Sequence, residues 1–263
     1  MKIHFDDQIF RLQKYGGISR YLVRIAEEFQ IMGHQPQILG GIHVNAYLRD
    51  LDPKIGKGLY IDHYPKRTIR LLRDSGRMVN QLRHAIGKAD VIHETYFSTE
   101  PVLKGAQPRV ISEYDCMFEL FPESFSPLEI VTQQKKAAFK RADLILSISH
   151  HTKEDIMRIF SIPEQKIKVT HLAADPAIPD HQILLPNPGG RPFLLYVGIR
   201  SKHKNFERLV RAFANSPRLM KEMDLVVFTP FAFSKEELNL FQQLGFGADQ
   251  VSCLLYTSDA ADE

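Results

Sequence analysis

The chain has 263 residues, of which 34 are Lys or Arg and 31 are Asp or Glu, so its formal net charge is +3. Hydrophobic residues make up 44% of the chain and charged residues 25%, which excludes a disordered protein because such chains combine low hydrophobicity with high net charge. The length allows one large domain or two smaller ones. The basic residues are scattered along the chain, so no nucleic-acid partner is expected.

Cysteine content and hydropathy bear on the compartment. Cys116 and Cys253 are the only cysteines, and two isolated thiols give neither a disulfide framework nor a metal-ligand spacing. No stretch approaches the ~18 uncharged apolar residues of a membrane span, and the first residues lack the apolar run of a signal peptide. We therefore expect a cytoplasmic protein without a bound metal. A surface patch could still bring it to the inner face of a membrane as a peripheral contact.

Short apolar runs alternate with amphipathic helical patterns along the first two thirds of the chain, which is typical of a parallel α/β sheet. Strands are expected at residues 3–5, 37–39, 90–93, 109–112, 144–148 and 167–172, and helices at 18–29, 133–141 and 152–160. Gly33 is expected to end the first helix with positive φ, and Ser149 to cap the last one. Five arginines between residues 45 and 85 punctuate helical-looking turns and are expected to form a solvated face: Arg67, Arg70, Arg73, Arg77 and Arg83.

The pattern breaks in a Pro- and Gly-rich stretch and then restarts, which indicates a linker between two α/β domains. Strands are expected at 193–197 and 225–228, and a helix at 206–214. Ser234 and Glu237 form the pattern of a capping box for a further helix, which Gly245 ends. The predicted division is a first domain at 1–175, a linker at 176–191, a partial second domain at 192–252 and a tail at 253–263.

The turn from Gly198 to Asn205 is the first candidate site. It follows a predicted strand and opens a predicted helix, which is where open α/β sheets bind ligands. Free N–H groups at a helix N-terminus favour a phosphate, and Arg200 and Lys204 would add full positive charges. A basic surface loop is the alternative. Gly16-Gly17 stands in the corresponding place after the first strand, where it permits a close approach of a ligand or forms a plain turn.

Several segments taken together resemble the family-4 glycosyltransferases. They are YGGISRY at 15–21, YDCMFELFPE at 114–123, RADLILSIS at 141–149 with Thr152, KIKV at 166–169, and YVGIR at 196–200 with KNF at 204–206. They occur in the family's order up to about Val251, and they are specific only as a set. The resemblance implies the GT-B fold, in which two Rossmann-like domains face a cleft. It also implies transfer of a sugar from a nucleotide sugar with retention of configuration, without a metal or other cofactor.

The resemblance assigns a nucleotide-sugar site to two turns. Arg200 and Lys204 match the basic pair that holds the donor diphosphate, where they would stabilise negative charge on the departing nucleotide. The other members of this predicted site are Gly198 and Asn205 in the same turn, and Gly16 and Gly17 in the loop near the donor phosphates and the reacting sugar.

The expected catalytic residues are Asp115, Tyr114 and His93. By resemblance Asp115 lies on a loop that faces the cleft, and Tyr114 stands where many members have a histidine. His93 ends another strand and is expected to line the acceptor side, although a lone histidine at a strand end is more often structural. The adjacent acids Asp6 and Asp7 also follow a strand, and we expect them to be solvated.

The second half departs from the family pattern. The family's second domain carries two glutamates separated by seven residues that contact the donor sugar and ribose, and no pair of glutamates here has that spacing. The usual Gly-Gly turn after residues 225–228 is replaced by TPFAF at 229–233. The residues from Leu254 onward resemble translated adapter sequence, with a natural acidic C-terminus as the alternative. We therefore expect a C-terminally truncated enzyme with an incomplete second domain.

Three functions follow from these observations. The first is a retaining hexosyltransferase that uses a GDP- or UDP-linked sugar, with mannose as the family-typical case, and a glycan or lipid-linked acceptor in polysaccharide or glycoconjugate biosynthesis. The chain itself is then expected to be inactive because it is truncated. The second is a non-catalytic GT-B-like module that holds nucleotide or glycan. The third is a sugar-nucleotide epimerase of the same fold, which the Arg-Lys turn fits less well.

Overall fold

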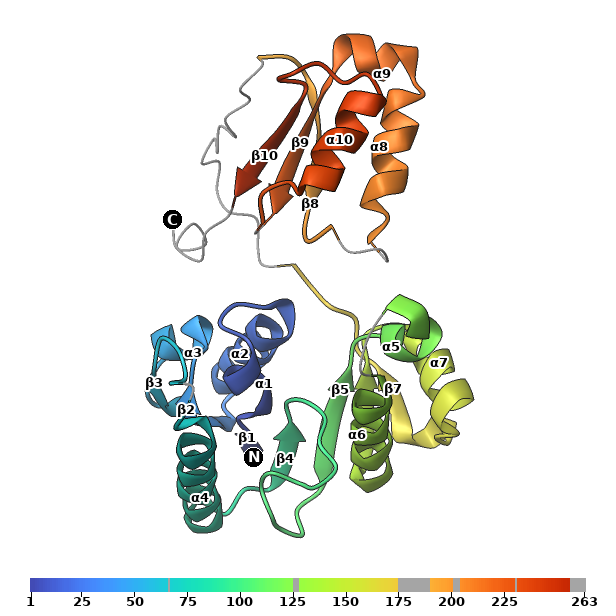
Figure 1. Ribbon diagram of the computed structural model, residues 1–263. Helices are drawn as coiled ribbons and strands as arrows, with labels where there is room; N and C mark the ends of the chain where they lie inside the picture. Colours follow the sequence, from blue (N-terminus) through green and yellow to red (C-terminus); the bar gives the residue numbers. More distant parts are fainter. Residues whose placement is uncertain (66, 125–127, 175–189, 201–203, 230, 256–263) are drawn as a thin grey trace. The chain divides into compact units, whose positions relative to one another are not determined.

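The computed structural model describes residues 1–65, 67–124, 128–174, 190–200, 204–229 and 231–255 (Figure 1). Contacts within the chain divide it into two compact units, Met1–Ala173 and Ala174–Glu263. The linker predicted at 176–191 lies outside the described residues except for Gly190 and Arg191. Each unit is built of parallel strands and helices, in agreement with the α/β fold class expected from the sequence.

The first unit contains a seven-stranded parallel sheet in the order β3-β2-β1-β4-β5-β6-β7. Its strands are β1 (Lys2–Phe5), β2 (Gln35–His43), β3 (Gly56–Tyr60), β4 (Val91–Glu94), β5 (Arg109–Glu113), β6 (Leu144–Ser147) and β7 (Ile167–Val169). All carboxyl ends therefore meet at one edge. The chain order reverses between β1 and β4, the switch point at which open α/β sheets bind ligands.

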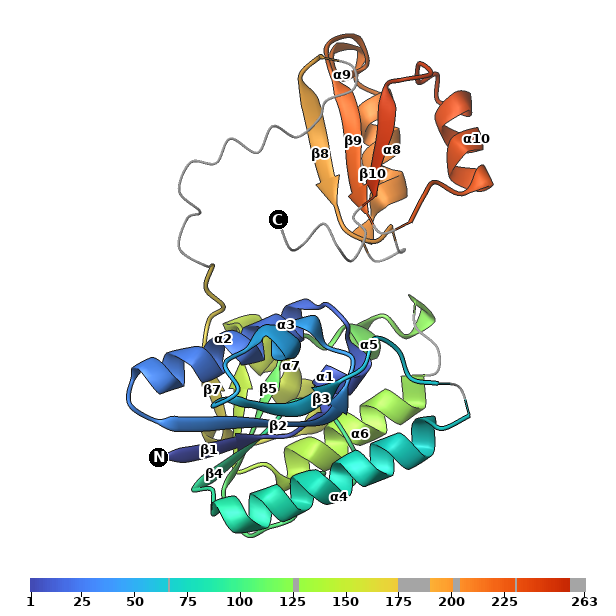
Figure 2. The same ribbon diagram turned by 90° about the vertical axis from the view of Figure 1, so that its left-hand side faces the viewer.

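The helices of this unit are α1 (Gln8–Leu12), α2 (Gly17–Ile31), α3 (Ala46–Asp50), α4 (Ile69–Gly87), α5 (Met117–Leu120), α6 (Leu128–Arg141) and α7 (His150–Phe160), with 3-10 turns η1 (Pro122–Ser124) and η2 (Glu164–Lys166). Figure 2 shows α2 and α4 on opposite faces of the sheet. The predicted cap of α7 is confirmed, since the Ser149 side chain accepts a hydrogen bond from the Thr152 amide. Gly33 ends α2 with φ +81° as predicted.

Two buried apolar clusters hold the first unit together. One joins β1, α1, α2, β2 and α3 and includes Phe5, Phe10, Leu22, Ala26 and Ile38. The other joins β5, α6, β6, α7 and β7 and includes Ile111, Ala138, Phe139, Ile145 and Ile156. Burial of these side chains removes apolar surface from water, which is the main favourable term in folding. The two clusters fix the strands on either side of the switch point.

The second unit has a three-stranded parallel sheet in the order β10-β9-β8 among its described residues. Its elements are β8 (Phe193–Val197), α8 (Phe206–Ala214), α9 (Pro217–Glu222), β9 (Asp224–Thr229), α10 (Lys235–Gln243) and β10 (Val251–Leu255). The predicted capping box of Ser234 and Glu237 is present at α10. Residues 253–255, assigned to the tail from the sequence, form the second half of β10, whereas 256–263 lie outside the described residues.

Candidate functional site

The loop after β5 carries two of the predicted catalytic residues at the carboxyl edge of the first sheet. Asp115 is exposed, and its Oδ1 accepts a hydrogen bond of 3.1 Å from the Met117 amide at the start of α5. The carbonyl oxygen of Asp115 accepts a bond of 2.8 Å from Lys135 Nζ. Both contacts fix the loop backbone, so that the carboxylate of Asp115 stands at the surface in a defined place.

Tyr114 joins this loop to helix α2. Its ring packs edge-on against the ring of Tyr21, with centroids 5.6 Å apart and planes at 87°. Burial raises the pKa of Tyr114, so its hydroxyl stays neutral and cannot serve as a base at neutral pH. Tyr21 lies one turn after Gly17, so the structure brings the β5 loop and the glycine turn of the first unit together.

The glycine turn opens α2 at that edge. Gly16 is the N-cap residue and makes no side-chain cap, and Gly17 is the first helical residue. A Cβ atom on Gly16 would lie 2.2 Å from Oε1 of Gln13, whereas a Cβ on Gly17 would meet nothing within 4 Å. There is therefore open space beside the exposed Gly17, at a helix N-terminus of the kind that is suited to an anion.

His93 has a different environment. It is 3% exposed, its ring stacks on Phe5 with centroids 5.0 Å apart, and its Nε2 lies 3.1 Å from Oγ of Ser112. Burial lowers its pKa to about 4, so the imidazole is neutral at pH 7. These contacts favour the structural alternative for His93 over a place on the acceptor side.

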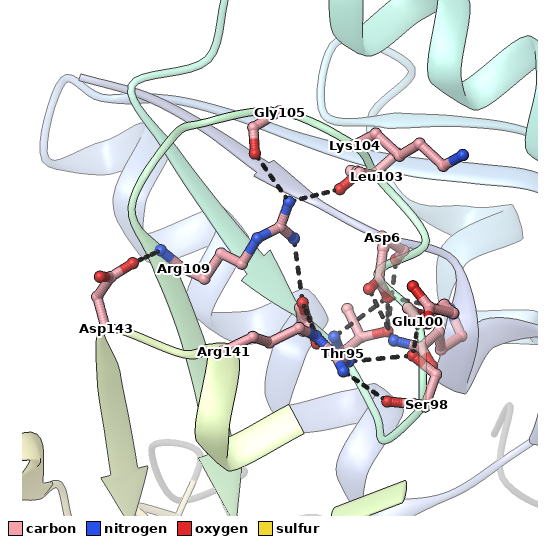
Figure 3. A network of polar contacts seen from close by, with 12 residues as sticks. Asp6, Thr95, Ser98, Glu100, Leu103, Lys104, Gly105, Arg109, Arg141 and Asp143 are labelled. Atoms are coloured by element: carbon pink, nitrogen blue, oxygen red, sulfur yellow. Dashed lines mark hydrogen bonds and ion pairs between the residues drawn. The ribbon is translucent and has the colours of Figure 1, made fainter. Parts of the chain in front are cut away.

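Glu94, next to His93, belongs to a buried ion cluster with Arg109 and Arg141, the two arginines labelled in Figure 3. Its Oε1 lies 3.0 Å from Nη1 of Arg109, and its Oε2 lies 2.5 Å from Nη2 of Arg141. Arg109 also donates to the carbonyl oxygens of Leu103 and Gly105, at 2.8 and 3.2 Å. Two guanidinium groups on one carboxylate thus tie the β4–β5 connection to β5 and α6. Each of these contacts joins one part of the first unit to another, which is a structural role.

The expectation that Asp6 and Asp7 are solvated is wrong, because both side chains are fully buried. Asp6 accepts hydrogen bonds from the Thr95 and Gln8 amides, each of 3.1 Å, and from Gln8 Nε2 at 2.8 Å. Asp7 accepts from Nδ2 of Asn80 at 3.2 Å and lies 3.3 Å from Nε of Arg11. Burial raises the pKa of Asp7 to about 6. The two acids fasten β1 to β4 and α4 at the switch point.

A buried lysine beneath the Asp115 loop escaped prediction from the sequence. Lys135 is 1% exposed, and its Nζ lies 2.9 Å from Oε1 of Glu113 and 3.2 Å from Oε2 of Glu119. Burial raises the pKa of Glu113 to about 8, and the Lys135 ammonium offsets only part of this rise. The signal was available: Lys135 precedes Ala138 by three residues and so shares the apolar face of α6.

In the second unit, Arg200 lies after β8 with every N–H donor engaged. Its Nε and Nη2 bind the two carboxylate oxygens of Glu237 at 2.6 and 3.0 Å. Nη1 donates to Oγ1 of Thr229 at 3.0 Å and to the Phe231 carbonyl at 2.9 Å, and Nη2 donates to the Ala232 carbonyl at 2.8 Å. The guanidinium therefore joins β8, β9 and α10, and a phosphate at this place would have to share or displace these partners.

The other residues of the predicted phosphate turn are more open. Lys204 and Asn205 are exposed, and Asn205 is the N-cap residue of α8 in the left-handed region at φ +56°. Gly198 has φ +124°, which favours glycine, and its amide donates to the Phe228 carbonyl at 2.9 Å. A Cβ on Gly198 would meet nothing within 4 Å. Among its described residues the turn thus offers one exposed ammonium, that of Lys204, at the N-terminus of a nine-residue helix.

Within the described residues, no group of three or more His, Cys, Asp or Glu side chains is arranged to hold a metal ion. No helix in the same part of the chain has the length and apolar character needed to cross a membrane.

Comparison with known proteins identifies the family. The profile of Glycosyltransferase Family 4 matches residues 15–178, more than half of the chain, and the chain therefore belongs to that family. The match includes the glycine turn, the Asp115 loop and most of the first unit. No curated protein matches the chain at a significant level.

Solved structures show the fold. The chain is similar to WaaG, a glycosyltransferase involved in lipopolysaccharide biosynthesis, at 16% identity and a TM-score of 0.65 over 98% of this chain and 71% of that one. It is also similar to the apo form of the lipopolysaccharide outer core galactosyltransferase WaaB, at 14% identity and a TM-score of 0.59, over 99% of this chain and 70% of that one. UDP-GlcNAc 2-epimerase from Neisseria meningitidis bound to UDP-GlcNAc matches at 10% identity and a TM-score of 0.55, over 98% of this chain and 73% of that one. The GT-B type of fold, with Rossmann-like units, is therefore confirmed.

Proposed function

We propose that the protein is a hexosyltransferase that takes a sugar from a nucleotide sugar, with retention, to a hydroxyl group of a glycan or lipid-linked acceptor. In this reaction the acceptor oxygen bonds to the sugar C1, the bond from C1 to the diphosphate breaks, and the hydroxyl proton passes to a base. The family match over residues 15–178 is the observation that carries this proposal. A cytoplasmic location, where nucleotide sugars are consumed, is part of the same proposal.

Each unit offers its own candidate contact for donor phosphates. In the first unit it is the N-terminus of α2 at the exposed Gly17, and in the second unit it is the exposed Lys204 before α8; either one would stabilise the negative charge of a diphosphate leaving group. The exposed Asp115 carboxylate is the group that we assign to the acceptor hydroxyl. Tyr114, held neutral by burial, would donate or accept a hydrogen bond without taking the proton.

One observation favours a second candidate, the non-catalytic binding module. Glu237 occupies two donors of Arg200, and the chain lacks the spaced glutamate pair expected of the family's donor site. A nucleotide sugar would then bind beside the exposed Lys204 without being turned over. The likeness to UDP-GlcNAc 2-epimerase is a likeness of fold, and it gives the epimerase alternative no support from a residue.

Calorimetric titration with UDP and GDP, followed by donor turnover assays, tests the proposal. We expect one nucleotide to bind, and Lys204→Ala to weaken binding about tenfold, the effect of losing one charged contact of about 1.4 kcal/mol. Lys221→Ala, an exposed lysine of α9, is the matched control and should leave binding unchanged. Absence of binding to either nucleotide would refute the proposal.

The turnover assay separates the candidates. GDP-mannose, UDP-galactose and UDP-GlcNAc are each incubated with the chain, and the products are identified by mass spectrometry and NMR. Release of free sugar or transfer to an added acceptor supports the transferase. A changed sugar that remains attached to its nucleotide would indicate the epimerase, and binding without any product would indicate that the chain with this sequence acts only as the module.

A further inference from the structure

Helix α4 is oriented with its polar side toward the sheet. Its buried residues are Gly76, Asn80 and His84. Gly76 lets the helix backbone approach β2, since a Cβ there would lie 3.0 Å from the Ile42 amide. Asn80 donates to Asp7, and Nδ1 of His84 lies 2.9 Å from Nδ1 of His4. The inner face of α4 thus carries small or polar side chains, and each of them contacts a residue of the sheet or of the turn after β1.

The outer face of α4 is apolar and uncovered by the described residues. Leu71, Met78, Leu82 and Ile86 are 70, 64, 57 and 81% exposed. Their spacing of seven, four and four residues places them in one stripe along the helix, about 22 Å long at 1.5 Å per residue. Figures 1 and 2 show α4 on the outside of the first unit, along the face of the sheet opposite α2. We call these four residues the α4 stripe.

Positive charge borders the α4 stripe. Between residues 67 and 88 there are six basic residues and one acidic residue, namely Arg67, Arg70, Arg73, Arg77, Arg83 and Lys88 against Asp74. On the helix, Arg70 and Arg77 flank the stripe on one side, together with Asp74, and Arg83 flanks it on the other. The sequence predicted that these arginines form a solvated face. It did not predict the exposed apolar surface that they border.

We propose that the α4 stripe docks on the surface of an anionic lipid bilayer. The four apolar side chains would enter the boundary between headgroups and acyl chains, and the flanking arginines would bind lipid phosphates. A second copy of the chain fits this face poorly. Pairing of two α4 helices would bring the six cations of each copy together, and each copy has only Asp74 between residues 67 and 88 to offset them. The inference rests on α4 alone and holds whichever activity the carboxyl edge supports.

Vesicle co-sedimentation of the purified chain tests the proposal. We expect binding to vesicles of phosphatidylcholine and phosphatidylglycerol in equal parts, weak binding to phosphatidylcholine alone, and loss of binding at high ionic strength. Leu82→Ser/Ile86→Ser should abolish sedimentation. Its matched control is Ile31→Ser/Met32→Ser, which alters two residues of similar exposure at the end of α2 and should leave binding unchanged.

Charge is tested separately. Arg70→Gln/Arg77→Gln should lower vesicle affinity about fivefold for each arginine removed, whereas Arg208→Gln/Lys221→Gln removes the same charge from the second unit without effect. Circular dichroism and thermal unfolding establish that each variant is folded. Failure of the parent chain to sediment with anionic vesicles overturns the proposal. So does a stable dimer in solution that Leu82→Ser/Ile86→Ser dissociates, or equal binding to both kinds of vesicle.

Discussion

Arg200 and Glu237 form a two-point ion pair, with Nε 2.6 Å from Oε1 and Nη2 3.0 Å from Oε2. The same carboxylate accepts a hydrogen bond of 2.7 Å from the Ser234 amide, so it caps α10 while it holds the guanidinium. The ion pair raises the pKa of Arg200 and keeps it charged. A residue assigned by resemblance to a diphosphate thus has an internal carboxylate in the place where a phosphate would bind.

The first prediction is that Glu237→Gln increases the affinity of the chain for the nucleoside diphosphate that it binds. Gln can still cap α10 but does not neutralise Arg200, so we expect a gain of about tenfold, together with a loss of about 1–2 kcal/mol in the free energy of unfolding. Glu236→Gln is the matched control, because Glu236 lies in the same first turn of α10 and is exposed. Equal nucleotide affinities of the two variants in calorimetric titration would show that Arg200 does not bind phosphate.

The second prediction concerns the buried cation beneath Asp115. Lys135→Met leaves the Glu113 and Glu119 carboxylates without their ammonium and the Asp115 carbonyl without a donor. We expect the free energy of unfolding at pH 7 to fall by about 3–5 kcal/mol. Lys136→Met changes the neighbouring, exposed lysine and should cost less than about 0.5 kcal/mol.

Denaturation of both lysine variants by urea at pH 7 and pH 9 checks this explanation. The pKa of Glu113 is about 8 in the parent chain, so Glu113 ionises beside the Lys135 ammonium as the pH rises past 8, whereas without that ammonium its pKa lies higher still. The difference between Lys135→Met and the parent chain should therefore grow between pH 7 and pH 9. A difference that stays the same at both pH values would mean that lost packing, and not unpaired charge, destabilises the variant.

Local patterns predicted much of the secondary structure, including α8 at Phe206–Ala214 and the capping box of α10. β3 escaped prediction because its sequence, GKGLY, has no apolar run; it is an edge strand that pairs only with β2. Amphipathicity indicated helical turns around the arginines of α4 but not which side of the helix faces the sheet. That orientation depends on Gly41 and His4, which are distant in sequence and leave room only for Gly76 and polar side chains.

The candidate site was predictable to the extent that it consists of local turns. The glycine turn before α2 and the turn before α8 lie at helix starts after strands, as expected. The burial of charged groups was not predictable, because each one depends on a partner far along the chain. Thr95 binds Asp6 across 89 positions, and Glu237 binds Arg200 across 37. A single sequence does not reveal such pairs.

The third prediction follows from the pKa of Asp7, which burial raises from 3.8 to about 6. The folded chain then binds this proton more tightly than the unfolded chain does, so the free energy of unfolding decreases as pH rises from about 4 to about 6. Asp7→Asn removes this cost and should stabilise the chain by about 2–3 kcal/mol at pH 8 but by little at pH 4.

Urea denaturation across this pH range measures the effect of Asp7. Asp74→Asn, at an exposed position of α4, is the control and should leave the pH dependence of stability as in the parent chain. If Asp7→Asn also leaves it unchanged, Arg11 and Asn80 compensate the buried carboxylate fully, and Asp7 is ionised in the folded chain throughout.

The fourth prediction separates folding from binding at the glycine turn. Gly17→Ala adds a methyl group that meets nothing within 4 Å, at a helical position where Ala is favoured over Gly by up to about 1 kcal/mol. The variant should therefore be at least as stable as the parent chain. If donor phosphates approach the Gly17 amide, the same methyl group obstructs them, and we expect nucleotide affinity to fall by about tenfold or more.

Gly33→Ala gives the opposite result at the other end of the same helix. Its φ of +81° disfavours a side chain, so the free energy of unfolding should fall by about 1 kcal/mol or more, while nucleotide binding is retained. Thermal unfolding and calorimetric titration of both variants thus measure two independent quantities. Unchanged nucleotide affinity in a stable Gly17→Ala chain would place the donor phosphates elsewhere and leave the N-terminus of α2 as a structural turn.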